Sequence, residues 1–301
     1  MTRLDKLAIV ITLALIIGFV LGHLNLPADA PDIGRRPLAP PQTIVPGEPP
    51  QSAAPLEPAP ARVRRPLPEP SPSDPTISVN AEAIPPDAVG IGTSFPVGSG
   101  LWLTARHVAN AECQQVLVVV GRTAMPAQIR YLHPDADLAL LETQRTTAPL
   151  LPIANEEIGA GDTGYSFGFP HNNLGGFEAT VLGRARMQLG GRLQGTAPVL
   201  AWAENLRFPE TLEALQGISG GPMLDESGDV VGIMVAVSAR RGRTFSVAPE
   251  ILRQVRQAFD LDTPSSAVAP VKEVVAKPVS LGDTATAMLR DSRIVPTVCK
   301  P

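Results

Sequence analysis

The stretch GISGGP at positions 217–222 decides how the rest of this 301-residue chain is interpreted. Ser219 lies among small residues, and Gly220 and Gly221 allow other backbone to approach closely, so the serine hydroxyl can be exposed. Gly217 can direct its N–H to the same side as the N–H of Ser219, and two such groups would form an oxyanion hole. A glycine–proline turn with an incidental serine is the alternative, and these residues alone do not separate the two.

The order of the other polar residues favours the nucleophile. A nucleophilic serine needs a base and a group that orients the base. All four histidines, His23, His107, His133 and His171, precede Ser219. The pattern G-x-S-x-G also fits the nucleophile elbow of α/β-hydrolases, but that fold places its histidine after the serine. The order His…Asp…Ser therefore remains, which is the order of the chymotrypsin-like double barrel.

The composition excludes some classes of function. The formal net charge is −4, which provides no basic surface for nucleic acid. Two cysteines, Cys113 and Cys299, are too few for a disulfide framework, but they allow one bridge in an oxidising compartment. We predict no metal and no cofactor.

An apolar segment near the start of the sequence has the length of a membrane span. Residues 7–26 approach the roughly 20 residues that cross a bilayer. Arg3 and Lys6 precede this segment, and positive charge before a first span keeps that end in the cytoplasm. We therefore predict a cytoplasmic N-terminus over residues 1–6 and a transmembrane anchor over residues 7–26.

A cleaved signal peptide is the alternative for this segment. The triplet Ala28-Asp29-Ala30 has the small residues of a cleavage site, but Pro31 follows it and should suit a signal peptidase poorly. We favour the uncleaved anchor in the inner (plasma) membrane. Both interpretations place the rest of the protein on the periplasmic or extracellular side.

The remaining chain divides into three parts by composition. Residues 27–76 are rich in proline and predict an extended, disordered linker. Residues 77–262 contain the apolar alternating segments and predict the folded domain. Residues 263–301 form a tail that is too short for a typical second domain, with a possible short helix over residues 281–290.

Short strands separated by glycine-rich turns dominate the predicted domain. This pattern is typical of an all-β barrel or sandwich. A closing helix is predicted at residues 249–259, with proline in its first turn. The predicted strands are 91–97, 101–104, 116–120, 127–132, 137–141, 163–169, 178–186, 198–203, 230–237 and 244–247, with a hairpin turn at 225–229.

Three motifs in order resemble a trypsin-like serine protease: TARHV at 104–108, DLALL at 137–141 and GISGGP at 217–222. The first two are most similar to the HtrA/Deg branch of that family, and the similarity extends over about residues 89–258. It implies a chymotrypsin-like double β-barrel and a serine endopeptidase that acts on polypeptide substrates. The branch usually adds a peptide-binding PDZ domain after the protease, and residues 263–301 are too few for one.

The resemblance and the chemistry of the residues assign the same roles. Ser219 would attack the scissile carbonyl, His107 would accept its proton, and Asp137 would orient the imidazole and stabilise the imidazolium. The N–H groups of Gly217 and Ser219 would bind the oxyanion.

Other residues compete for the roles of base and acid. His133 precedes a proline at a predicted strand end, and His171 follows a proline in a glycine-rich loop that we expect at the surface. Asp135 is the rival acid. Asp137 opens an apolar strand and matches the family position, so the resemblance favours the pair His107 and Asp137.

Two positions depart from the family pattern. The residue before the nucleophile is usually polar, but here it is Ile218, which we expect to alter the surface of the loop. Val235 stands where the family has a serine that supports the catalytic aspartate, and valine cannot donate that hydrogen bond.

The resemblance also identifies a substrate-binding strand. Met234, Val235, Ala236 and Val237 match the strand that pairs with an extended substrate backbone. Val237 would line the primary pocket, which favours small or medium apolar side chains. Glu213 lies six residues before Ser219, where trypsin places its specificity acid, but we expect an ordinary surface glutamate here.

The two cysteines predict a bridge that attaches the tail to the domain. Cys113 follows His107 by six residues, at the end of a segment that we expect to form a short helix. A bridge from Cys113 to Cys299 would hold the tail near this histidine. The alternative is a buried thiol at Cys113 and a free or intermolecular one at Cys299. For the whole chain we predict a membrane-tethered serine endopeptidase. A catalytically silent barrel that binds extended peptides is the alternative function.

Overall fold

The computed structural model describes residues 65–81, 90–144, 148–191, 193–238, 241–261 and 280–300. The predicted anchor at 7–26 and most of the predicted linker lie outside these residues. Within the described ranges, none of the helices has both the length and the apolar character needed to cross a membrane.

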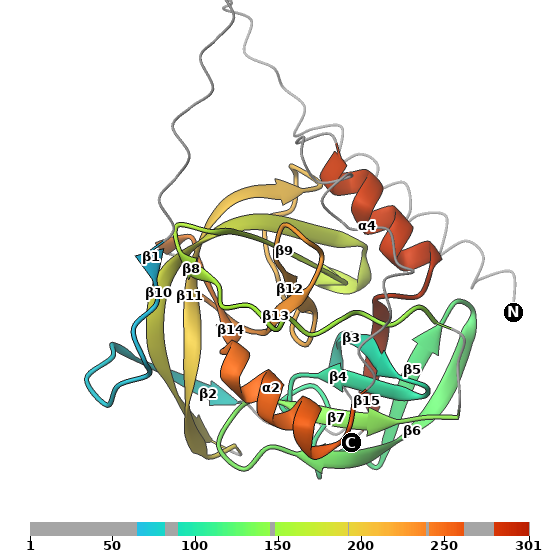
Figure 1. Ribbon diagram of the computed structural model, residues 1–301. Coiled ribbons are helices and arrows are strands. Elements are labelled where there is room, and N and C mark those ends of the chain that lie inside the picture. Colours follow the sequence, from blue (N-terminus) through green and yellow to red (C-terminus); the bar gives the residue numbers. More distant parts are fainter. Residues whose placement is uncertain are drawn as a thin grey trace, which may run out of the picture. The chain divides into compact units, whose positions relative to one another are not determined.

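Six strands form a closed barrel, which lies at the lower right of Figure 1. Neighbouring strands pair antiparallel in the order β15-β3-β4-β7-β6-β5. Their bounds are β3 Gly90–Gly98, β4 Leu101–Thr104, β5 Gln115–Val120, β6 Thr123–Leu132, β7 Ala139–Glu142 and β15 Val295–Lys300.

The strand that closes this barrel comes from the region predicted to be a tail. β15 pairs with β3 on one side and with β5 on the other. The predicted domain boundary at residue 262 therefore leaves out one of the six strands of the barrel. The predicted helix at 281–290 is present as α4, Ser280–Arg290, directly before β15.

A second sheet has the strand order β11-β14-β13-β12-β9-β10-β2. An additional pairing between β10 and β11 closes six of these strands into a ring, so the predicted all-β double barrel is present. The remaining strand, β2, lies parallel to β10 on its outer edge. The bounds are β2 Thr76–Ala81, β9 Thr163–Gly168, β10 Gly175–Gly191, β11 Gly195–Phe208, β12 Pro222–Leu224, β13 Val230–Ser238 and β14 Arg243–Val247.

Shorter elements complete the described chain. β1, Arg65–Pro66, pairs with β8, Gly159–Ala160. The predicted closing helix is α2, Pro249–Ala258, which begins at a proline. The first N–H groups of a helix have no carbonyl partner within it, so proline at this position costs no hydrogen bond. A 3₁₀ turn, η1, spans Pro170–Asn172 between β9 and β10.

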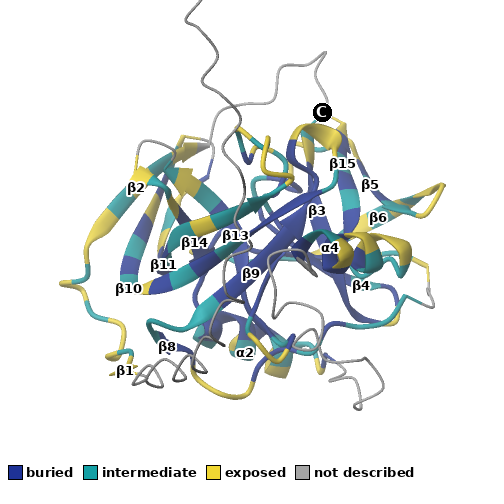
Figure 2. Cartoon of the chain, turned by 90° about the horizontal axis from the view of Figure 1, so that it is seen from above, coloured by how far each residue is buried: buried dark blue, intermediate teal, exposed yellow. Residues whose placement is uncertain are grey.

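Strand alternation divides the core into layers. Trp102 and Leu141 belong to the cluster inside the first barrel, while Leu103 and Leu140, one residue away, belong to a larger cluster between the two sheets. A third cluster, which includes Trp202, fills the second ring. Figure 2 shows the buried residues concentrated along β3, β9 and β13, and the candidate site lies at this junction.

Candidate active site

His107 lies on a single turn that follows β4. The N–H groups of Val108 and Ala109 both donate to the carbonyl of Ala105, at 3.1 and 3.3 Å, and no longer helix forms there. The predicted short helical segment from His107 to Cys113 is therefore wrong. The helical hydrogen bonds stop after this turn, and Asn110 uses its side chain to accept from the N–H of Glu112 instead.

Asp137 is buried directly before β7 and faces His107. Its side chain is 1% exposed. One carboxylate oxygen accepts from the backbone N–H of His107 at 2.9 Å, and the other lies 2.6 Å from Nδ1 of the same residue. Because a carboxylate opposite Nδ1 favours a proton there, Nε2 is left as the nitrogen that can accept a proton.

The rival residues have structural roles. Nδ1 of His133 accepts from the backbone N–H groups of Asp135 and Ala136, at 3.2 and 2.9 Å, so this ring holds the turn before β7. Burial lowers the pKa of His133, and the charge of Arg106 lowers it further against the opposing effect of Asp135. Asp135 itself is exposed.

The serine loop needs its glycines for conformation and for space. Gly217 has a φ of +102°, and a Cβ there would lie 2.4 Å from the carbonyl oxygen of Phe169. Gly220 has a φ of +85°, and a Cβ there would lie 2.1 Å from the carbonyl oxygen of Thr93 and 3.0 Å from the backbone nitrogen of Ala105. The second contact places the serine loop directly against the turn of His107.

Ile218 anchors this loop in the core. Its side chain is fully buried in the cluster that fills the second ring, with Leu215 and Trp202 among the members. The expectation that Ile218 alters the loop surface is therefore wrong. In the family that the sequence resembles, this position usually has a polar residue. Here the buried isoleucine stabilises the loop through the hydrophobic effect.

Thr93 holds the serine loop from the first barrel, and sequence reasoning missed it. Its backbone N–H donates to the carbonyl of Ser219 at 2.8 Å, and its hydroxyl donates to the carbonyl of Gly217 at 2.9 Å. The same hydroxyl accepts from the N–H of Phe169 at 3.2 Å. No local pattern marks Thr93, because the hydroxyl and its Gly217 partner lie 124 residues apart in the chain.

The backbone N–H groups of Gly217 and Ser219 are the candidate donors to an oxyanion. The carbonyl of Gln216 accepts from the N–H of His171 at 2.8 Å, and in a trans peptide this turns the N–H of Gly217 to the opposite side. Among the hydrogen bonds of the described residues, the N–H groups of Gly217 and Ser219 donate to no protein group. His171 is exposed, as expected, and contributes its backbone in a left-handed conformation.

The predicted substrate-binding strand begins beside the serine loop. Met234 donates to the carbonyl of Gly221 and accepts from the N–H of Gly220, at 2.9 and 2.7 Å. Val235 is buried in the apolar cluster between the sheets, and Val237 is 39% exposed. Glu213 is exposed, as expected for a surface glutamate.

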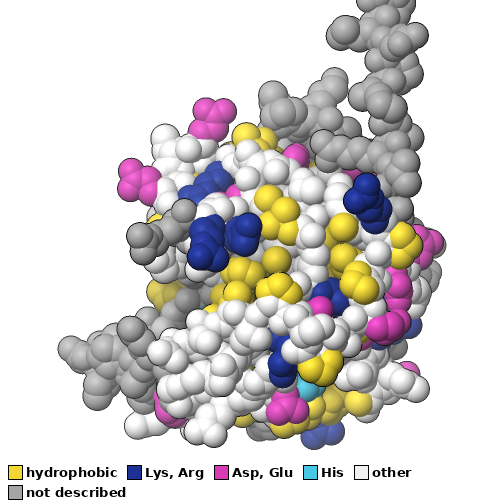
Figure 3. Space-filling model, turned by 90° about the vertical axis from the view of Figure 1, so that its left-hand side faces the viewer, with side chains coloured by type: hydrophobic (Ala, Val, Ile, Leu, Met, Phe, Trp, Pro, Cys, Tyr) yellow, Lys and Arg dark blue, Asp and Glu magenta, His cyan; other side chains and the backbone are white. Residues whose placement is uncertain are grey.

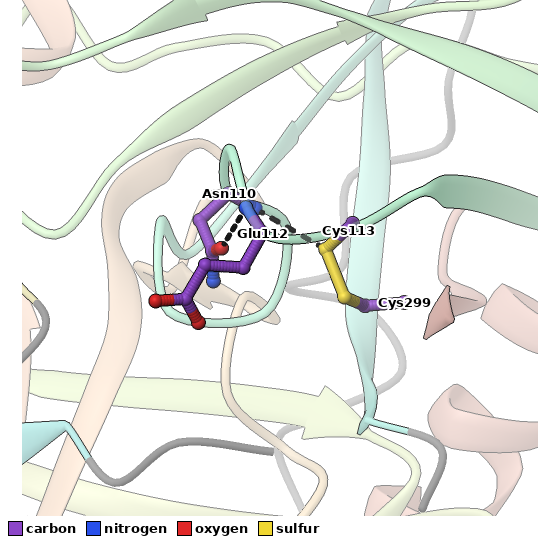
Figure 4. Close-up of a disulfide and its surroundings, with 4 residues drawn as sticks. All are labelled: Asn110, Glu112, Cys113 and Cys299. Carbon is purple, nitrogen blue, oxygen red and sulfur yellow. Dashed lines mark hydrogen bonds between the residues drawn. A yellow bond between two sulfur atoms is a disulfide. The ribbon is translucent and has the colours of Figure 1, made fainter. Parts of the chain in front are cut away.

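A disulfide joins Cys113 and Cys299, as predicted. Figure 4 shows Cys113 beside Asn110 and Glu112. In the chain, the loop with these three residues follows the turn of His107. The bridge therefore attaches β15 to the loop that follows the candidate base. In the described part of the chain, no group of three or more histidine, cysteine or acidic side chains is placed to bind a metal ion.

Comparisons with known proteins point to one family. The family model described as the trypsin-like peptidase domain matches residues 92–233. A probable periplasmic serine endoprotease DegP-like of Ectopseudomonas mendocina is 26% identical over 184 residues, which cover 58% of this chain and 36% of that protein. The serine protease Rv3671c of Mycobacterium tuberculosis is 30% identical over 149 residues, which cover 48% of this chain and 35% of that protein.

Solved structures are similar as well. The crystal structure of the active form of the Rv3671c protease aligns with a TM-score of 0.49 and 21% identity, over 66% of this chain and 96% of that chain. The chain spans between 26% and 38% of the length of the first curated relatives that it matches.

The fold and the matched residues define a trypsin-like peptidase domain. Residues 92–233 match this domain, and relatives that match the chain are named as DegP-like and other serine proteases. The resemblance found in the three sequence motifs is therefore confirmed.

Proposed function

We propose that this chain is a membrane-tethered serine endopeptidase that cleaves polypeptides with Ser219 as its nucleophile. The observation that supports this most strongly is the pair of His107 and Asp137. A buried carboxylate bonds to Nδ1 of the imidazole and to the backbone N–H of His107, on a turn that packs against the serine loop.

The proposed reaction follows the general scheme of a serine protease. Nε2 of His107 takes the proton of the Ser219 hydroxyl as the oxygen attacks the scissile carbonyl carbon. His107 then gives that proton to the leaving amine. Asp137 stays ionised and stabilises the imidazolium between these steps. Water repeats the sequence on the acyl-enzyme, which releases the acid and restores the serine.

The oxyanion would be held by the N–H groups of Gly217 and Ser219. Both lie in a loop whose carbonyl groups already have partners on Thr93 and His171. The donors therefore need little rearrangement when negative charge develops on the carbonyl oxygen. Removal of one such donor in other serine proteases costs about 10²- to 10³-fold in kcat.

The substrate backbone would pair with β13 from Met234 to Val237. Val237 would contact the side chain before the scissile bond, which supports a preference for small or medium apolar residues there. The relatives that match are named serine endoproteases, which is consistent with cleavage inside polypeptides.

Labelling with a fluorophosphonate probe tests this proposal. We expect covalent modification of the full chain at Ser219, identified by peptide mapping, and no labelling of Ser219→Ala. Labelling that persists in Ser219→Ala would remove the assignment of the nucleophile. A folded chain that binds peptides but is never labelled would favour the silent barrel.

The location of the protein is a second part of the proposal. Residues 7–26 are apolar and follow Arg3 and Lys6, which supports an anchor with its N-terminus in the cytoplasm. Curated relatives are named periplasmic, which supports an extracytoplasmic position for the peptidase domain. We expect the mature protein to fractionate with membranes and to resist extraction by salt. A soluble product that begins near Pro31 would instead identify a signal peptide.

A further inference from the structure

One edge of β13 is open beyond the point where it leaves the serine loop. From Val230 to Ile233 this strand pairs with β12, and Met234 bonds to the backbone of Gly220 and Gly221. From Ala236 to Ser238 the described residues provide a partner only on the other side, where β14 pairs with it. A peptide added antiparallel to the open edge would extend away from Ser219 on the N-terminal side of its scissile bond.

The open edge leads into a groove of about 530 Å³. Ala236, Val237 and Ser238 form its near side, and the parallel strand β2 forms its far side with Ile77 and Val79. These two β2 side chains pack against the core, and Leu182 on β10 adds an apolar side chain that is 47% exposed. The groove therefore combines backbone that can pair with a peptide and apolar surface that can contact its side chains.

The groove is positively charged. Arg184, Arg241 and Arg243 line it, and no acidic side chain of the described chain does. Arg184 is engaged by Glu250 at 2.8 Å, so its charge is neutralised locally. Arg241 and Arg243 are exposed and have no ion-pair partner among the described residues. Figure 3 views the side of the molecule with β10 and β11, where basic and apolar side chains gather next to one another.

We propose that this groove binds the N-terminal side of a polypeptide substrate and selects an acidic side chain several residues before the scissile bond. At about 3.4 Å per residue, the substrate positions that pass Val235 to Ser238 span roughly 10 Å. Ser238 pairs with Arg243, so the carboxylate lies near Arg243 and Arg241 at about the fourth or fifth position before that bond. This inference rests on the proposed function, because Ser219 defines the position of the scissile bond.

Peptide binding tests the groove without requiring catalysis. The probes are three fluorescent peptides with a small apolar residue before the scissile bond and Glu, Gln or Lys at the fourth position before it. Anisotropy titrations use the full chain with Ser219→Ala, which cannot cleave them. We expect the Glu peptide to bind more tightly than the Gln peptide by about threefold to tenfold, as two partly exposed charge contacts allow. The Lys peptide should bind most weakly, and the differences should shrink at high salt.

Charge reversal on the groove separates this site from a general electrostatic effect. The paired substitution Arg241→Glu and Arg243→Glu should reverse the order of the peptides, whereas Arg241→Lys with Arg243→Lys should keep it. Arg122→Glu changes an exposed charge on the turn after β5 and serves as the matched control, which should keep the wild-type order. Unchanged thermal unfolding of the variants excludes misfolding as the cause.

The outcomes distinguish the groove from the peptidase itself. Equal affinity for the three peptides, or an order that the arginine reversal leaves intact, would overturn the groove assignment even if the wild type is labelled at Ser219. Failure of fluorophosphonate labelling would overturn the proposed function, while a charge-dependent order of binding would still support the groove. In active protein, the same preferences should appear in kcat/KM, mainly through KM.

Discussion

At the scale of single residues, the candidate site combines side chains from short motifs with contacts between distant segments. His107, Asp137 and Ser219 belong to the motifs. Thr93 and His171 hold the serine loop through contacts between distant segments, and the loop uses the backbone of His171 rather than its side chain. Residues of any type can offer backbone groups for such contacts, so no sequence pattern reveals them.

The first prediction concerns the orientation of the imidazole. Asp137→Asn should preserve the fold but lower kcat by about 10⁴-fold, as the corresponding change does in a related enzyme, because the amide supports the wrong tautomer. Steady-state kinetics on a peptide substrate measure this loss. Asp135→Asn is the matched control, since Asp135 is exposed and the carboxylate that bonds to Nδ1 of His107 is that of Asp137. If Asp137→Asn kept more than a tenth of the activity, the acid would have to be sought elsewhere.

The second prediction concerns the buried hydroxyl of Thr93. Thr93→Val keeps the shape of the side chain but removes the donor to Gly217 and the acceptor for Phe169. Leaving such groups unpaired costs about 1–3 kcal/mol each, so we expect a lower melting temperature and slower labelling of Ser219. Thr93→Ser retains the hydroxyl and should stay close to the wild type. Equal labelling rates for the valine and serine variants would show that this hydroxyl does not position the loop.

At the scale of elements, local alternation identified several short strands of both barrels, but not β12 or β15. The predicted strands at 101–104 and 244–247 agree with β4 and β14 within a residue. The prediction underestimated β10 and β11, which continue beyond the predicted ranges 178–186 and 198–203. Their ends pair with each other, and the ends of β10 also pair with β9 and β2, so the partners come from other strands and not from the local sequence pattern.

A third prediction belongs to the turn between β12 and β13. Burial raises the pKa of Asp229 above its usual 3.8, and the nearby charges of Asp225 and Glu156 raise it further. Asp229→Asn should therefore increase the free energy of unfolding near neutral pH, by less than about 1 kcal/mol after solvent screening.

Because folding raises the pKa of Asp229, the stabilisation by Asp229→Asn should depend on pH. A carboxyl whose pKa is raised by folding destabilises the protein only where it is ionised. The gain should be absent below the unfolded pKa and should grow as the pH rises through the folded pKa. Denaturant unfolding at several pH values measures it. Glu226→Gln, an exposed acid of the same turn, is the control, and an advantage of Asp229→Asn that persists at low pH would exclude this explanation.

At the scale of the whole molecule, the motifs were enough to predict the double barrel. They did not predict that β15 closes the first barrel. β15 shows alternate burial at Val295, Thr297 and Cys299, yet a six-residue strand within the predicted tail has no local sign of its partners. Pro296 is unfavourable inside a sheet, because proline has no N–H to donate to a strand ladder. The pairing with β5 begins only at Thr297, so Pro296 has β3 alone as its neighbour.

The fourth prediction concerns the bridge that attaches β15. The disulfide closes a loop of 186 residues, and chain-entropy arithmetic gives roughly 5 kcal/mol as an upper estimate of its stabilisation. Replacing Cys113 and Cys299 with alanine should lower the unfolding midpoint and slow the labelling of Ser219, because β15 and the loop after His107 lose their covalent connection. Reduction with a dithiol should have the same effect on the wild type and none on the double variant. Non-reducing peptide mapping must first recover the bridged peptides, and free thiols in protein isolated under oxidising conditions would contradict the bridge.

The position of β15 at the end of the described chain bears on when a newly made protein could become active. The ribosome translates the turn of His107 early, but the strand that completes the surrounding barrel emerges after every other described strand. A nascent chain, whether still on the ribosome or crossing a translocon, would therefore hold its histidine and aspartate in an open barrel. Proteolysis would begin only once translation has delivered residues 295–300. If the peptidase domain is exported, as proposed, such a delay would protect the export machinery from it.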